Sequence, residues 1–192
     1  ANNLIYHKTL AITPNPPYLP TSFRTPIYPL WLAIIYLIFR SYNAAVFIGA
    51  FVFALLVPIA YLIGKEIFSE KIAIIAALFS GLEPWALYQS GFLAAEQIFM
   101  PIFLFSIYLF IRYLKSSSIS TLCLSSLALG IAVLTRPAAL FFVSIFIFLT
   151  FIFEFKHSLR QAFKISVSAF LIFLAVLSPW FIRNKIVLNT WQ

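Results

Sequence analysis

Residues 137–155, PAALFFVSIFIFLTFIFEF, carry a single charged side chain, that of Glu154. An α-helix of this length extends about 28 Å, close to the roughly 30 Å thickness of the hydrocarbon core of a bilayer. Such a stretch is typical of a transmembrane helix. Similar apolar stretches predict further spans at about residues 44–64, 72–92, 95–114, 118–135 and 165–182. The sequence therefore predicts an all-α, polytopic membrane helix bundle with about six transmembrane helices.

The overall composition agrees with a membrane protein and excludes a soluble globular domain. Apolar residues make up 63% of the chain and charged residues 9%, against about 25% charged residues in soluble domains. The net charge of +8 comes from 13 lysines and arginines set against five glutamates, and most of the cations lie between apolar stretches rather than in one patch. This distribution favours contact with membrane lipids and argues against nucleic-acid binding.

The first part of the chain differs from the rest. Residues 1–26 are polar and rich in proline, and the prolines exclude regular helix over residues 13–26. Residues 27–39, IYPLWLAIIYLIF, are apolar but reach only about 20 Å as a helix, so they predict one short interfacial or re-entrant helix. We therefore divide the chain into an outer loop and interfacial helix, 1–43, and a transmembrane bundle, 44–192. The start at Ala1, without a signal peptide, suggests a piece of a longer protein.

The short connections between the spans predict antiparallel neighbouring helices. If the spans alternate, the loops at 65–71, 112–118 and 156–164 lie on one side of the membrane. These loops carry Lys65, Lys71, Arg112, Lys115, Lys156, Arg160 and Lys164. By the positive-inside rule, this side is predicted to be cytoplasmic.

Polar side chains gather toward the opposite, outer side. They are Glu83, Tyr88, Gln89, Glu96, Gln97, Arg136, Arg183 and Asn184. Glu83 lies deep in its predicted span, where an ionised group costs about 2.5 to 3.5 kcal/mol, so we expect it to face the bundle. The alternative is a neutral, hydrogen-bonded Glu83 at a helix distortion set by Pro84.

Three charged residues near the outer ends of the spans each have two interpretations. Arg136, before Pro137, and Arg183, after Trp180, are either interfacial anchors or phosphate ligands, because a guanidinium group offers forked donors. Glu96 lies where one span ends and the next begins, so it is either a functional carboxylate or a favourable charge at a helix N-terminus.

Motifs for other chemistries are missing from the sequence. It contains no HExxH, paired CxxC, Gly-rich phosphate loop or GxSxG, and His7 and His157 fall on opposite sides of the predicted topology. A zinc site, a nucleotide site and a serine hydrolase are therefore unsupported. The use of a divalent metal cofactor is left undecided by the sequence, which contains no motif that supports it.

The order of four stretches resembles a known family. They are RTPIYPLWLAIIYLIF (24–39), AALFSGLEPWALYQSGFLAAEQIF (76–99), LALGIAVLTRPAALFF (127–142) and LSPWFIRNKIVLN (177–189). Together they resemble GT-C membrane glycosyltransferases of family 39, the dolichyl-phosphate-mannose protein mannosyltransferases, and the related aminoarabinose transferases. The resemblance implies transfer of a sugar from a polyprenyl-phosphate carrier, on the outer face and with inversion, to a protein or lipid acceptor.

The resemblance also implies roles for individual residues. Arg24 and Tyr28 match an RPPGYP-like stretch beside the active site, and Glu96 matches the acidic residue that opens the next outward-facing helix. Arg136 matches the arginine of an LTRP stretch, and Arg183 matches that of a PWxxRN ending. Such chemistry needs cations to hold the carrier phosphate and a carboxylate to take the acceptor's proton. We therefore predict Glu96 as the catalytic residue, with substrate binding by Arg24, Tyr28, Glu83, Arg136 and Arg183.

The sequence also departs from the family pattern. The family's principal acidic residue, usually Asp, follows a first span, and this sequence has neither that span nor any Asp. We therefore expect this stretch alone to be inactive. Two other classes stay open, a transporter or channel fragment with Glu83 and Glu96 on an ion path, and a non-catalytic membrane scaffold. The expected location is a bacterial or archaeal plasma membrane.

Overall fold

The computed structural model describes residues 1–11, 13 and 15–190 and is all-α, as the sequence predicts. Its helices are α1 (Asn2–His7), α2 (Ile27–Phe39), α3 (Tyr42–Phe53), α4 (Leu56–Ile67), α5 (Glu70–Leu82), α6 (Pro84–Ser90), α7 (Glu96–Ser116), α8 (Ile119–Thr135), the 3₁₀ turn η1 (Pro137–Ala139), α9 (Leu140–Phe155) and α10 (Leu159–Leu188). In the described part of the chain, the β-structure is one isolated bridge, between Ala11 and Pro20.

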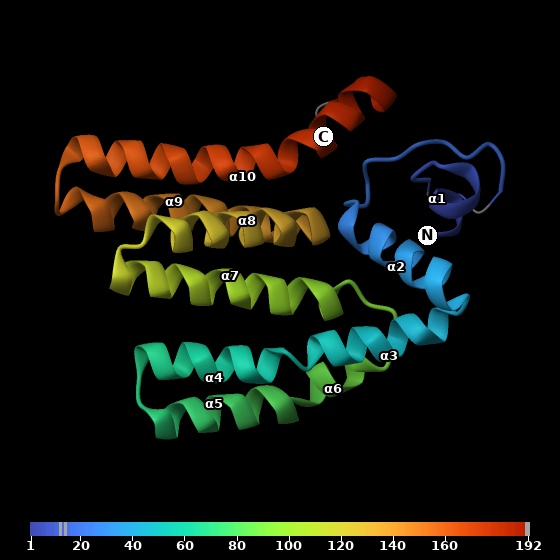
Figure 1. Cartoon of the computed structure of the whole chain (residues 1–192). Coiled ribbons are helices and arrows are strands. Elements are labelled where there is room, and N and C mark those ends of the chain that lie inside the picture. The colour runs from blue at the N-terminus through green and yellow to red at the C-terminus, as the bar shows by residue number, and fades with distance from the viewer. Residues whose placement is uncertain (12, 14, 191–192) are drawn as a thin grey trace.

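The helices from α3 to α10 form a bundle along roughly one direction, in which α3 continues into α4 and α5 into α6, and α1 and α2 lie at one end (Figure 1). The turns α4–α5, α7–α8 and α9–α10 all lie at the other end (Figure 1). This confirms that the three loops rich in lysine and arginine share one side. We call that side the basic end, and the opposite one the α2 end. The cytoplasmic location of the basic end stays a prediction.

The number of spans differs from the predicted six. Helices long and apolar enough to cross a membrane are Tyr42–Ile67, Glu96–Ser116, Pro137–Phe155 and Leu159–Leu188, which makes four among the described residues. The α5–α6 pair makes a fifth only if its two parts, bent by 50°, count as one span. The remaining predicted span, α8, has 17 residues and reaches about 25 Å. Six is therefore too many if each span must be a single helix long enough to cross the membrane, although all six predicted stretches are mainly helical.

The bend between α5 and α6 has a local cause. Pro84 lacks an N–H donor and disfavours helical geometry in the residue before it, and Glu83 is accordingly extended, with φ −61° and ψ 119°. The Glu83 carboxylate caps α6 by accepting hydrogen bonds from the backbone N–H groups of Trp85, at 3.0 Å, and Ala86. Glu83 is exposed, so the expectation that it faces the bundle is wrong. The structure shows the position and hydrogen bonding of the alternative, at the distortion set by Pro84.

The core lies between α7, α8, α9 and α10, and α8 is at its centre. Small residues let neighbouring helices approach α8 closely. At Gly130 of α8, a Cβ atom would lie only 2.9 Å from Cβ of Val176 in α10. Leu129 and Ala132 of the same helix are buried in the core cluster. This burial explains how a helix that is short for a span is retained in the bundle.

A buried polar contact joins three helices of this core near the basic end. Glu154 of α9 is 2% exposed, and its carboxylate accepts hydrogen bonds from the Tyr113 hydroxyl of α7 and from Nε2 of Gln161 in α10, the latter at 2.8 Å. Tyr113 is fully buried. A buried carboxylate is tolerated where such donors satisfy it.

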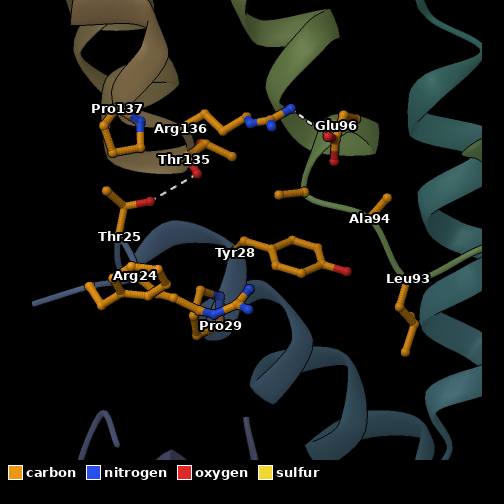
Figure 2. A pocket seen from close by; sticks show the side chains of 12 residues that line it. Arg24, Thr25, Tyr28, Pro29, Leu93, Ala94, Glu96, Thr135, Arg136 and Pro137 are labelled. Atoms are coloured by element: carbon orange, nitrogen blue, oxygen red, sulfur yellow. Dashed lines mark hydrogen bonds and ion pairs between the residues drawn. The ribbon is translucent and has the colours of Figure 1, made fainter. Parts of the chain in front are cut away.

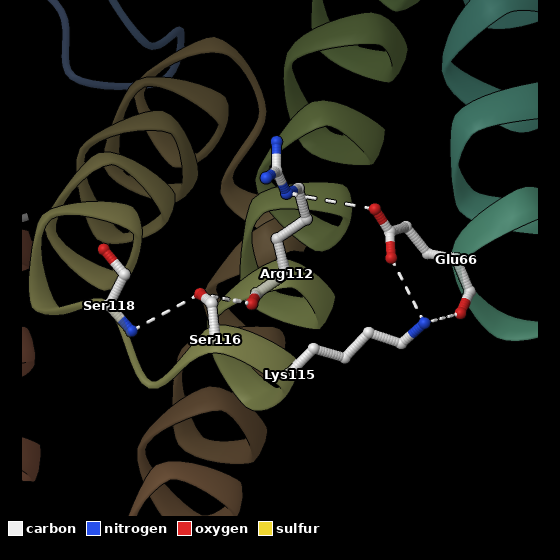
Figure 3. A network of polar contacts seen from close by, with 5 residues as sticks. All are labelled: Glu66, Arg112, Lys115, Ser116 and Ser118. Carbon is white, nitrogen blue, oxygen red and sulfur yellow. Dashed lines mark hydrogen bonds and ion pairs between the residues drawn. The ribbon is translucent and has the colours of Figure 1, made fainter.

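A second, exposed network joins α4 to α7 at the basic end (Figure 3). The Lys115 ammonium lies 3.1 Å from the Glu66 carboxylate and also donates to the Glu66 backbone carbonyl. The guanidinium of Arg112 approaches the same carboxylate at 3.9 Å. Exposed pairs of this kind contribute about 0–1 kcal/mol each, so packing rather than charge holds α4 against α7.

The contact between α4 and α5 gives a first testable prediction. A Cβ atom at Gly64 would lie 2.7 Å from the backbone Cα of Ala73, which cannot move without separating the two helices. We expect Gly64→Leu to destabilise the protein by about 1–3 kcal/mol and to lower its midpoint of thermal unfolding in detergent by about 3–10 °C. Circular dichroism on heating measures this. Gly91→Ala is the control, because a Cβ there meets only the Tyr88 carbonyl, at 3.6 Å, and an equal loss in both variants would refute the packing argument.

Candidate functional site

A cavity of about 520 Å³ opens at the α2 end, where three distant segments of the chain meet (Figure 2). The first segment is the end of the amino-terminal loop with the start of α2, the second is the α6–α7 connection, and the third is the α8–η1 turn. The lining residues are Phe23, Arg24, Thr25, Tyr28, Pro29, Leu93, Ala94, Ala95, Glu96, Thr135, Arg136 and Pro137. The cavity therefore contains four of the six predicted site residues.

A hydrogen bond fixes the first segment to the third. Thr25 Oγ1 donates to the backbone carbonyl of Thr135, at 2.9 Å (Figure 2). Pro26, whose ring fixes φ, then leads into α2, which places Tyr28 on the first helical turn and directs its ring across the cavity. Arg24 is exposed and forms no ion pair or hydrogen bond within the part of the chain that the structure describes.

The second and third segments are joined by an ion pair. Glu96 is the first residue of α7, and Arg136 lies between α8 and η1 with an extended backbone, φ −146° and ψ 119°, as expected for a residue before proline. This geometry directs the Arg136 side chain across the cavity to Glu96, and its Nη1 donates to the Glu96 carboxylate (Figure 2). Both side chains stay partly exposed, at 45% for Arg136 and 26% for Glu96. Both therefore remain accessible to a ligand.

Tyr28 brings a neutral donor to the cavity. Its hydroxyl is buried and has no hydrogen-bond partner among the described residues. Burial, together with the negative charge of Glu96, raises the pKa of Tyr28 to about 12, while the Arg24 charge acts in the opposite direction. The phenol therefore stays protonated at neutral pH. A buried donor without a partner is costly, so this position favours a hydrogen-bond acceptor beside the hydroxyl.

Arg183 lies outside the cavity lining but supports it. Its Nη1 donates to the backbone carbonyl of Thr21, at 2.9 Å, and to Oδ1 of Asn184, at 2.8 Å. The guanidinium also lies over the Trp180 ring, 5.1 Å from its centroid. Arg183 thus holds the loop that carries Phe23 and Arg24 against the end of α10.

Two other polar residues of the predicted outer cluster, Glu83 and Gln97, have structural roles. Glu83 caps α6 away from the cavity, and its predicted role in substrate binding has no support from this geometry. Gln97 is fully buried, and its Nε2 donates to the carbonyls of Gln89, at 3.4 Å, and Ser90, at 2.9 Å, which joins the end of α6 to α7. This contact positions the α6–α7 connection that lines the cavity.

Two polar residues of the cavity were missed by the sequence reasoning. Thr25 and Thr135 fix the cavity geometry, yet threonine is ordinary in loops and at span ends. Their position in the sequence could have indicated them, because Thr25 directly follows Arg24 and Thr135 directly precedes Arg136, two predicted site residues.

The lining of the cavity combines two guanidinium groups, one carboxylate and one phenol. Its formal charge is therefore positive, which favours an anionic group in contact with the arginines, beside a carboxylate that can accept a proton. Within residues 1–11, 13 and 15–190, no group of three or more His, Cys, Asp or Glu side chains is placed to hold a metal ion.

Comparison with known proteins agrees with this combination of fold and site. A family model described as dolichyl-phosphate-mannose-protein mannosyltransferase matches residues 23–182, which include every residue that lines the cavity. A search of curated proteins and a search of solved structures each found no match. The apolar helices and this match define a membrane glycosyltransferase of the GT-C type. The chain belongs to the dolichyl-phosphate-mannose-protein mannosyltransferase family.

Proposed function

We propose that this chain carries part of the active site for transfer of a sugar from a polyprenyl-phosphate-linked donor to a protein or lipid acceptor, on the outer face of the membrane and with inversion. The observation that carries the proposal is the cavity at the α2 end, in which Arg24, Arg136 and Glu96 meet from three segments. Cations for a phosphate and a carboxylate for a proton are the groups that this transfer needs.

The donor phosphate is proposed to lie between the two arginines. Among the described residues, no carboxylate pairs with Arg24, so its N–H donors are free for a ligand. Arg136 uses only Nη1 for Glu96, and a guanidinium group has five N–H donors, so it can hold a phosphate oxygen while it keeps the ion pair. The Tyr28 hydroxyl, which is buried and without a partner, is proposed to donate to an oxygen of the same donor substrate.

Glu96 is proposed to act on the acceptor. In the ion pair, Arg136 fixes the orientation of this carboxylate at the edge of the cavity. A carboxylate within hydrogen-bond reach of the attacking hydroxyl can take its proton as the bond to the sugar forms. The leaving phosphate carries the negative charge that develops, next to the same arginine.

Arg24→Ala tests the phosphate contact with little risk to the fold, because Arg24 is exposed and unpaired within the described residues. We expect the KM for the polyprenyl-phosphate donor to rise about tenfold with a small change in kcat, since one charge-assisted contact is lost. Initial rates with a radiolabelled donor, measured on the full-length protein in membranes, give both constants. Lys8→Asn is the control, a lost cation in the same loop at a residue with φ 51°, where asparagine is tolerated.

The same assay separates this proposal from the two other classes. If the full-length protein transfers no sugar from any polyprenyl-phosphate donor, the glycosyltransferase hypothesis is contradicted, and a transporter or a scaffold remains. Transfer with an unchanged KM in Arg24→Ala would keep the enzyme reading and remove Arg24 from the donor site.

A further inference from the structure

A second groove lies at the basic end of the bundle, between α8 and α10, and encloses about 550 Å³. Its walls change in character along α10. Arg160 and Lys164 line it in the first turns of the helix, and Ile165 and Ile172 follow deeper along the same helix, opposite the buried Leu122 of α8. One end of the groove is therefore cationic and the other is apolar.

Among the described residues, no ion pair compensates the positive charge of this groove. Arg160 and Lys164 are four residues apart, so they lie on one face of α10, and both are exposed. The five glutamates of the chain all have other partners. Glu66 and Glu96 form ion pairs, Glu70 accepts from the Tyr61 hydroxyl, Glu83 caps α6 and Glu154 is in the buried contact with Gln161. The two cations are therefore free to bind an anion.

We propose that this groove binds one anionic phospholipid, with the phosphate between Arg160 and Lys164 and an acyl chain along Leu122, Ile165 and Ile172. Twelve residues of helix separate Arg160 from Ile172, about 18 Å, which is close to the roughly 15 Å depth of one leaflet's hydrocarbon. Basic pockets between transmembrane helices are a recurrent way to hold acidic lipid headgroups. A free phosphate ion would satisfy the cations but leave the apolar wall unused.

Native mass spectrometry of the full-length protein, purified in detergent, tests this inference independently of sugar transfer. The protein is incubated with dioleoyl phosphatidylglycerol or with dioleoyl phosphatidylcholine, and bound lipids are counted. We expect one phosphatidylglycerol to bind at least tenfold more tightly than phosphatidylcholine. The double variant Arg160→Ala/Lys164→Ala should bind phosphatidylglycerol at least tenfold more weakly, because each cation next to an anionic headgroup adds to the binding free energy.

Two further variants separate a lipid groove from general attraction of charge. Lys71→Ala/Lys156→Ala removes two exposed cations from the same end but outside the groove, and it should keep the bound lipid. Ile172→Trp fills the apolar part and should weaken phosphatidylglycerol binding while both cations remain. Equal losses in the two double variants, or displacement of the lipid by millimolar inorganic phosphate, would overturn the proposal.

Discussion

Arg136→Ala in the full-length protein should lower the rate of sugar transfer by about 100-fold or more, the largest effect on activity that the structure predicts. The substitution removes a donor from the proposed position of the leaving phosphate, and loss of one such preorganised donor typically costs about 10²–10³ in kcat. It also removes the partner that orients Glu96. The measurement is single-turnover transfer from a radiolabelled polyprenyl-phosphate donor.

A double-mutant cycle with Glu96→Gln shows whether the ion pair acts as one unit. We expect each single variant to lose most of the activity and the double variant to lose little more, because groups that act together are strongly non-additive. Arg112→Ala is the matched control, an exposed arginine in an ion pair at the basic end. Purely additive losses, or a loss of activity in Arg112→Ala as large as in Arg136→Ala, would contradict the assignment.

Glu154→Ala should cause the largest loss of stability. It leaves the fully buried Tyr113 hydroxyl without its acceptor and creates a cavity where α7, α9 and α10 meet. An unsatisfied buried donor costs about 1–3 kcal/mol and the cavity a similar amount, so we expect about 3–5 kcal/mol in total. The midpoint of thermal unfolding in detergent should fall by about 6–15 °C, as followed by circular dichroism.

Glu154→Gln is the informative companion to this variant. Its amide oxygen can still accept from the Tyr113 hydroxyl, and Gln161 can turn its own amide to accept from the new NH₂ group. We therefore expect Glu154→Gln to retain most of the stability. If it were as unstable as Glu154→Ala, the negative charge itself, and not the hydrogen bonding, would hold the three helices.

The sequence was sufficient for the helices whose apolar residues are continuous. The predicted span at 95–114 corresponds to α7 (Glu96–Ser116) because apolar length alone defines it. The last span, predicted at 165–182, extends over Leu159–Leu188, since hydropathy does not detect polar turns at helix ends. There the Ser158 side chain caps the helix by accepting from the Gln161 backbone N–H, at 3.1 Å.

The site was predictable only where a charged residue adjoins a break in the apolar pattern. Arg24, Tyr28, Glu96 and Arg136 do meet at one cavity, but Arg183 acts one step away, on the loop. Whether a residue lines the cavity depends on the direction of its side chain. In a uniformly apolar helix, the hydrophobic periodicity does not indicate that direction. The sequence does not indicate the role of Glu154 either, because its donor Tyr113 lies on α7, 41 positions earlier in the chain.

The length of α8 has a consequence for the surrounding bilayer. At 17 residues it reaches about 25 Å, some 5 Å less than an average hydrocarbon core. Along its exposed side, at Leu124, Leu127 and Ile131, this hydrophobic mismatch is relieved most simply by local thinning of the membrane. Arg136 follows directly after the end of α8. We therefore expect the membrane surface to dip toward the cavity, so that a lipid-linked phosphate meets the arginines while its chain stays in the leaflet.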